Sequence, residues 1–221
     1  MQCLPKDRRP HAAPLSVVGS ALLSDSQDIL LQELGLARLG QAQLSGFDGR
    51  ASIDMIERLR VPLWLRSDHH LVQLVESAAS HEYQAGDRDP MSCLLLYAAL
   101  GGARIEVLAR LFAIDSQKVM AAMLTTIARR DKEGDSARRT ALDTAHLLMS
   151  RHAHMRAAGF FLLGGDPATA VRVLYRTAGL PMMALIVARL SRTHAEGGAD
   201  RTVGGREWGS LRATVEKSNP I

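Results

Sequence analysis

The amino-acid sequence predicts an all-α fold, an irregular α-solenoid of antiparallel helix pairs with disordered termini. Of the 221 residues, 47% are hydrophobic but only 4% are aromatic, so the core must consist mainly of Leu, Ala, Val, Ile and Met. This mixture favours helices over strands. Apolar residues recur three and four positions apart in several segments, and no segment alternates convincingly as a strand does. Tight turns separate these segments, as in stacked helix pairs.

The helical segments lie between two ends whose composition predicts no packed structure. We expect a flexible leader at residues 1–24, a helical solenoid domain at 25–195 and a flexible Gly-rich tail at 196–221. In the leader, basic residues precede the apolar stretch 15–23, which is the order of a signal or transit peptide. Prolines interrupt that order and no clean cleavage site follows, so a flexible leader is favoured over a targeting segment. No apolar stretch approaches the roughly 20 residues of a membrane-spanning helix.

Four segments have the spacing of a helix with one buried face. They cover residues 71–82, 105–112, 119–127 and 142–149. Ser67 or Asp68 can cap the first of these helices at its N-terminus. The pair Asp115–Ser116 can cap the third in the same way.

A fifth helix is apolar on nearly every side. It covers the run from Cys93 to Leu100, with Asp89 as its N-cap and Pro90 in the first turn, where no N–H is needed. Gly101–Gly102 can end it with positive φ angles. A helix that is apolar all round is buried. We therefore expect Cys93 to be a small core residue rather than a reactive thiolate.

The last third of the domain repeats helix stop and start signals. Gly164–Gly165 can end one helix, and Asp166–Pro167 can cap and begin the next; "GLP" at 179–181 repeats the device. The small residues 157–159 allow a neighbouring helix to approach closely, while the apolar residues 160–163 fill the core.

No motif predicts catalysis, a cofactor or a metal ion. The phosphate-binding glycine patterns and the nucleophile elbow are absent from the sequence. His81 and Glu82 begin like a zinc-protease motif, but Ala85 stands where the second histidine is required. His152 and His154 are two positions apart and would point away from each other on a helix. We therefore expect a protein that is not an enzyme and takes no small-molecule substrate.

The charged residues favour a protein partner. The net charge is only +4 and acidic residues are mixed with the basic ones, so a small basic helical protein that binds nucleic acid is kept as an alternative only. Two arginine pairs flank "DKEGDS", which suggests a solvated loop that a partner can reach. Another arginine lies just outside the cap at Asp89. The candidate interaction residues are Arg88, Arg129, Arg130, Arg138 and Arg139.

Four sequence blocks carry a resemblance to a known family. They are "VPLWLRSDHHLVQLVESAA" (61–79), "RDPMSCLLLYAAL" (88–100), "TALDTAHLLMSRHAHMRAAGFFLLGG" (140–165) and "AVRVLYRTAGLPMMALIVARL" (170–190). In this order they resemble the C-terminal helical region of the large subunit of the RAVE complex, the DmX and rabconnectin-3 alpha family. The resemblance is clearest over 55–190, and the first two blocks, with Trp64, are its more specific part.

The resemblance implies a non-catalytic scaffold that promotes assembly of the vacuolar proton-translocating V-ATPase, and with it vacuolar and endosomal acidification. The implied partners are V-ATPase cytosolic-sector subunits and other RAVE-type subunits, without a cofactor. The implied location is cytoplasmic, peripheral at vacuolar or endosomal membranes and with only indirect membrane association. A helical solenoid from a vesicle coat or tethering protein is the alternative that the same helix pattern leaves open.

Overall fold

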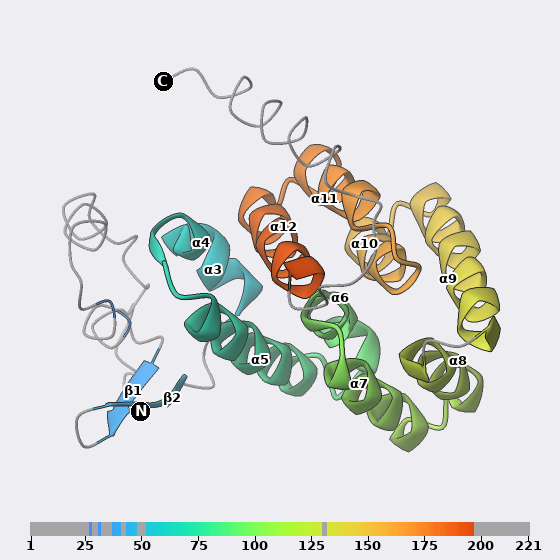
Figure 1. Ribbon diagram of the computed structural model, residues 1–221, viewed down its shortest axis with the longest axis horizontal. Helices are drawn as coiled ribbons and strands as arrows, with labels where there is room; N and C mark the ends of the chain where they lie inside the picture. Colours follow the sequence, from blue (N-terminus) through green and yellow to red (C-terminus); the bar gives the residue numbers. More distant parts are fainter. Residues whose placement is uncertain are drawn as a thin grey trace, which may run out of the picture. The chain divides into compact units, whose positions relative to one another are not determined.

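The structure is a computed structural model. Its described residues include ten helices, α3 to α12, which pack largely against their neighbours in sequence (Figure 1). It describes residues 52–129 and 132–196, the strands Ala37–Gly40 and Gln43–Phe47, and the single residues Gln27 and Leu31. Of the described residues, those up to Ser191 form one compact unit. The predicted all-helical fold is confirmed. The predicted leader at 1–24 lies outside the described residues, as does the predicted tail at 196–221 apart from Glu196.

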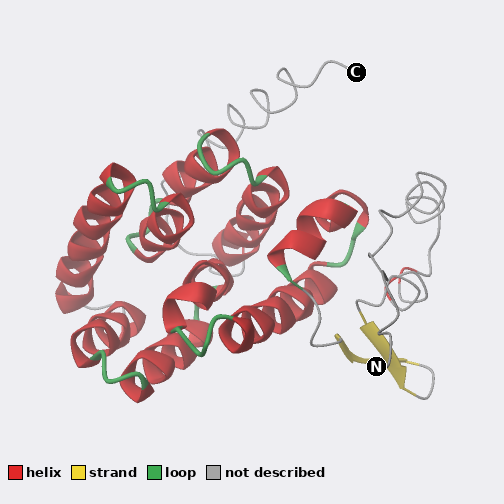
Figure 2. Cartoon of the chain, turned by 180° about the vertical axis from the view of Figure 1, so that it is seen from behind, coloured by secondary structure: helices red, strands yellow, loops and turns green. Residues whose placement is uncertain are grey.

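One short β-hairpin departs from the expectation that the domain has no strand. Strand β1 (Ala37–Gly40) pairs antiparallel with β2 (Gln43–Phe47), with Ala37 opposite Phe47 (Figure 2). The prediction was wrong here because each strand contains a glycine, which is depleted in strands, and Gln43–Phe47 does not alternate strictly.

The first helices begin and end at the residues that their sequence signals indicate. Helix α3 (Ile53–Leu59) and the single turn α4 (Val61–Trp64) precede the long helix α5 (Asp68–Ala85). The hydroxyl of Ser67 accepts a hydrogen bond from the His70 N–H at 3.3 Å. Of the two capping candidates for α5, Ser67 is therefore the N-cap.

Helix α6 (Pro90–Leu100) confirms the prediction of a buried apolar helix. The carboxylate of Asp89 accepts a hydrogen bond from the Met91 N–H at 2.9 Å, so Asp89 is its N-cap. Gly101 ends the helix at φ 59°, in the left-handed region that glycine adopts without strain. None of the residues of α6 is exposed.

Helices α7 (Ala103–Ile114) and α8 (Lys118–Arg129) form the next pair, and one predicted cap is wrong. Asp115 is the C-cap of α7, not the N-cap of α8. Ser116 has φ 62°, whereas an N-cap residue takes an extended backbone. The N–H of Ala121 donates to the Gln117 carbonyl at 3.0 Å, so α8 begins after Gln117.

The second half contains α9 (Lys132–Ser150), α10 (His154–Leu163), α11 (Pro167–Arg176) and α12 (Pro181–Glu196). The predicted Asp166 cap is confirmed, since its carboxylate accepts from the Thr169 N–H at 2.9 Å. The solvated loop predicted for "DKEGDS" is wrong, because α9 already begins at Lys132. Glu133 and Asp135 lie in its first turn, where negative charge favours a helix.

A close helix contact joins the two halves of the domain. Helix α10 packs against α6 as well as against its sequence neighbours α9 and α11. At the crossing, a Cβ on Gly159 would overlap the Leu94 side chain and lie 3.3 Å from the Leu95 Cα. Ala157 and Ala158 are also fully buried. The small residues of α10 therefore allow the close approach that the sequence predicted.

Polar contacts connect helix α12 to the beginning of the domain. Glu57 of α3 accepts hydrogen bonds from the N–H groups of Met182 and Met183, at 3.1 and 2.8 Å. These are first-turn N–H groups of α12, which have no partner inside their own helix. Glu57 is therefore a cap for α12 that is supplied by a residue more than a hundred positions away.

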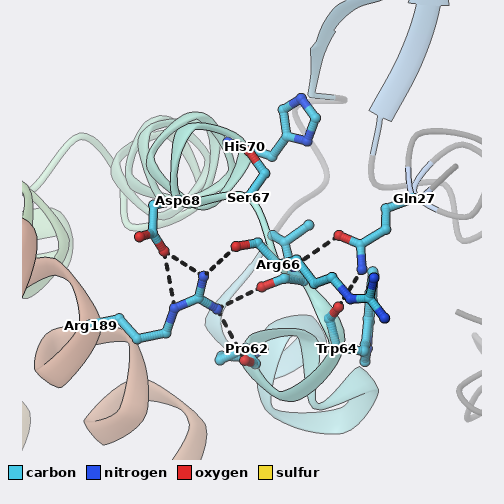
Figure 3. Close-up of polar contacts among 9 residues, drawn as sticks. Gln27, Pro62, Trp64, Arg66, Ser67, Asp68, His70 and Arg189 are labelled. Atoms are coloured by element: carbon cyan, nitrogen blue, oxygen red, sulfur yellow. Dashed lines mark hydrogen bonds and ion pairs between the residues drawn. The ribbon is translucent and has the colours of Figure 1, made fainter. Parts of the chain in front are cut away.

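Arg189 of α12 makes the second connection, shown in Figure 3. Its guanidinium donates to the carbonyls of Pro62 (3.1 Å), Leu65 (2.6 Å) and Arg66 (3.2 Å), and also pairs with Asp68. A planar group with five donors suits such an array of acceptors. Arg189 thereby fixes the segment between α4 and α5 against α12.

The same segment is held from its other side by Gln27. The Gln27 amide donates to the Trp64 carbonyl at 2.6 Å and accepts from the Arg66 N–H at 2.8 Å (Figure 3). Trp64 is 1% exposed, and its indole N–H donates to the Leu59 carbonyl at 2.9 Å. This buried tryptophan thus has its polar atom satisfied.

Substitution of Gly159 by alanine tests the α6–α10 contact. We expect Gly159→Ala to lower the free energy of unfolding by about 1–3 kcal/mol, because the added Cβ overpacks the crossing. Urea unfolding followed by circular dichroism measures it. In a Leu94→Val background the loss should be smaller, since the colliding atom is removed. An equal loss in both backgrounds would contradict this account.

Substitution of Arg189 by lysine tests the α12 connection. An ammonium cannot reproduce the fork of contacts to three carbonyls, so we expect Arg189→Lys to cost about 1–3 kcal/mol of unfolding free energy. Arg172→Lys, on the exposed face of α11, is the matched control and should change it by less than about 0.5 kcal/mol. Equal effects of the two substitutions in thermal unfolding would refute a special role for Arg189.

Candidate protein-interaction surface

Arg88 is presented to solvent by the turn between α5 and α6. Its N–H donates to the Tyr83 carbonyl at 2.9 Å, and its φ of 64° is left-handed. The next residue, Asp89, is fixed as the N-cap of α6. The backbone of Arg88 is therefore held from both sides while its side chain is exposed.

The other predicted arginines lie on a different helix pair, α8 and α9. Arg129 is the last residue of α8 and is exposed, as is Arg139 in α9. Arg138 is only 31% exposed and pairs with Asp135 one turn earlier at 3.1 Å. Arg130 lies outside the described residues. The structure thus presents Arg129 and Arg139 on neighbouring helices, and it does not bring Arg88 into the same cluster.

Cys93 has the properties of a core residue, as predicted. Burial raises the pKa of its thiol to about 12, and the thiol donates to the Pro90 carbonyl. A thiol with such a pKa is protonated at neutral pH, so it is a poor nucleophile and a poor metal ligand.

The carboxylate of Glu82, next to His81, is engaged in structure. It accepts a hydrogen bond from the Ile53 N–H at 3.0 Å, at the start of α3. Within the described residues, no three His, Cys, Asp or Glu side chains come together as metal ligands. Across the same residues, none of the helices has the length and apolar character to cross a membrane.

Arg156 is an exposed cation near Arg88 that the sequence analysis missed. It lies in the first turn of α10 and pairs with Asp89 at 3.6 Å, with 52% and 43% of the two side chains exposed. A pair this exposed contributes little stability. The sequence did contain a signal for an exposed position here, because Arg156 is the only Arg, Lys, Asp or Glu between His154 and Leu163.

The four sequence blocks of the resemblance meet in space. Arg189, in the fourth block, bonds the carbonyls of the first block, and Gly159, in the third, packs on Leu94 of the second. Glu57 and Arg189 escaped the sequence analysis because their partners are more than a hundred residues away. The sequence signal that could have identified Arg189 was its position as a charged residue inside the otherwise apolar stretch 182–190.

Comparison with known proteins connects this architecture to one family. Residues 15–199 match the family described as "RAVE protein 1 C terminal". Over 159 residues, the chain is 29% identical to "Regulator of V-ATPase in vacuolar membrane protein 1" of Saccharomyces cerevisiae. That alignment covers 71% of this chain and 10% of the yeast protein's length. Because the family match extends over most of the chain, this protein belongs to the family defined by the RAVE protein 1 C-terminal region.

Proposed function

We propose that this chain is a non-catalytic scaffold module of the RAVE type that promotes assembly of the V-ATPase. The observation that carries the proposal is the family match over residues 15–199, together with a yeast relative whose name describes a regulator of that enzyme. On this proposal the partners are V-ATPase cytosolic-sector subunits and other RAVE-type subunits. The chain works in the cytoplasm, at the surface of vacuolar or endosomal membranes.

Among the described residues, the charged side chains either stabilise the fold or are exposed to solvent. This arrangement supports a scaffold. The polar side chains with long-range contacts, such as Glu57, Glu82 and Arg189, bond backbone groups of their own chain. Arg88, Arg129 and Arg139 are exposed at helix ends or on an outer helix face. We assign contact with a partner to these three arginines. The family match favours this function over a vesicle-coat segment or a nucleic-acid binder.

Affinity purification of the full chain from cells that express it tests the function. We expect V-ATPase cytosolic-sector subunits to be recovered, and we expect Arg88→Glu combined with Arg139→Glu to reduce their recovery several-fold. Charge reversal at a docking surface replaces attraction with repulsion. Arg172→Glu, an exposed site on α11, is the matched control and should leave recovery unchanged.

Two results would contradict the proposal. If no V-ATPase subunit is recovered with the unmodified chain, the function is wrong. If recovery is kept by the double variant, the arginines are not the contact residues. Circular dichroism of each variant shows whether it has kept its helical fold, so that loss of binding is separated from loss of structure.

A further inference from the structure

A hollow of about 380 Å³ lies where the N-terminal end of α10 meets the C-terminal end of α11. It is lined by His152, Ala153, His154, Met155, Arg156, Thr177 and Ala178. Three of these side chains carry or can accept positive charge. The others offer small or apolar surface, with one hydroxyl. The hollow is largely open to solvent, so it suits an extended segment lying across it rather than an enclosed small molecule.

The surroundings of the hollow are basic. Between residues 144 and 195 the chain contains six arginines and no lysine, and its only acidic residue is Asp166. Asp166 caps the start of α11, whereas the hollow lies at the end of that helix. Arg151 and Arg176 are exposed and directly adjoin the lining residues in sequence. Asp89 pairs with Arg156 and offsets part of this charge, so Arg151, Arg156 and Arg176 together leave the hollow with an excess of positive charge.

The cationic groups of the hollow are only partly used by the chain itself. Arg156 has one weak partner, Asp89 at 3.6 Å, whose carboxylate also caps α6. The Nδ1 atom of His154 is buried and has no hydrogen-bond partner in the structure, while the His154 ring packs edge-on against His152 at 5.8 Å. Buried polar atoms without a partner are rare in folded proteins. A carboxylate bound in the hollow would give Arg156 a second partner, whereas the buried Nδ1 atom of His154 is not accessible from it.

We propose that this hollow binds a short acidic segment of a partner protein, through carboxylates to Arg156 and His152 and apolar contact with Met155. A small anion would leave most of the 380 Å³ unfilled. The lining includes no large exposed apolar side chain that could insert into a lipid surface and no Phe, Tyr or Trp on which a base could stack. The hollow lies on other helices than Arg139 but adjoins Arg88 through the Arg156–Asp89 pair. Binding of the acidic segment is tested on the purified chain and does not require the V-ATPase.

Direct binding of a labelled hexaglutamate peptide to the purified full chain tests the proposal. Fluorescence anisotropy should show binding that weakens as salt rises. Arg156→Gln should weaken it roughly threefold to tenfold, because one charge-assisted contact is lost. Arg172→Gln and Arg139→Gln remove the same charge outside the hollow and should leave the affinity unchanged. Amide chemical shifts of Ala153, Thr177 and Ala178 should move as the peptide is added.

Three outcomes would overturn the acidic-segment assignment. The first is equal weakening by Arg156→Gln and Arg139→Gln, which would indicate attraction to the net charge alone. The second is no hexaglutamate binding at low salt. The third is binding of inorganic phosphate or phosphatidylserine vesicles that depends on Arg156 while the peptide fails to compete. Recovery of V-ATPase subunits is measured separately, so failure here leaves the proposed function standing.

Discussion

The close approach of α10 to α6 is the contact on which the rest of the domain depends. Helix α6 is enclosed by α5, α7 and α10, and Gly159 lets the α10 backbone come within van der Waals distance of Leu94 and Leu95. Between α6 and α10, the chain otherwise runs through α7, α8 and α9, each of which packs on its neighbours in sequence. Burying α6 on all sides removes its apolar surface from water, which is the dominant favourable term in folding.

The polar contacts of α12 form a second link between the two halves of the domain. Apolar packing is not directional, so it does not by itself decide the position of a terminal helix along its neighbours. Glu57 and Arg189 fix the position of α12, because hydrogen bonds are directional. Glu57 bonds the first-turn amides of α12, and Arg189 of α12 bonds the carbonyls before α5. The blocks that resemble the RAVE large subunit therefore include residues that hold this fold together, while the exposed arginines lie outside those contacts.

Among the described arginines discussed above, some are engaged within the domain and others are exposed. Arg189 is largely buried and Arg138 is paired within its helix, so both are committed to the domain itself. Arg88, Arg129 and Arg156 are exposed, with at most weak pairing. Surface ion pairs add little to stability, so exposed arginines at helix ends cost the fold little and are free to serve recognition.

Local signals determined most of the fold from the sequence alone. Helical spacing, the caps Ser67, Asp89 and Asp166, and the burial of Cys93 follow from interactions within a few residues, and these predictions were confirmed. The loop at "DKEGDS" was wrong because its acidic residues lie in the first turn of α9, where negative charge favours a helix. The cap at Asp115 was wrong because Asp115 ends α7 instead. Only the tertiary structure decided that α10 returns to α6, that Arg189 bonds the α4–α5 segment, and that Arg156 pairs with Asp89. These contacts join positions far apart in the chain, and no local pattern encodes which distant groups will meet.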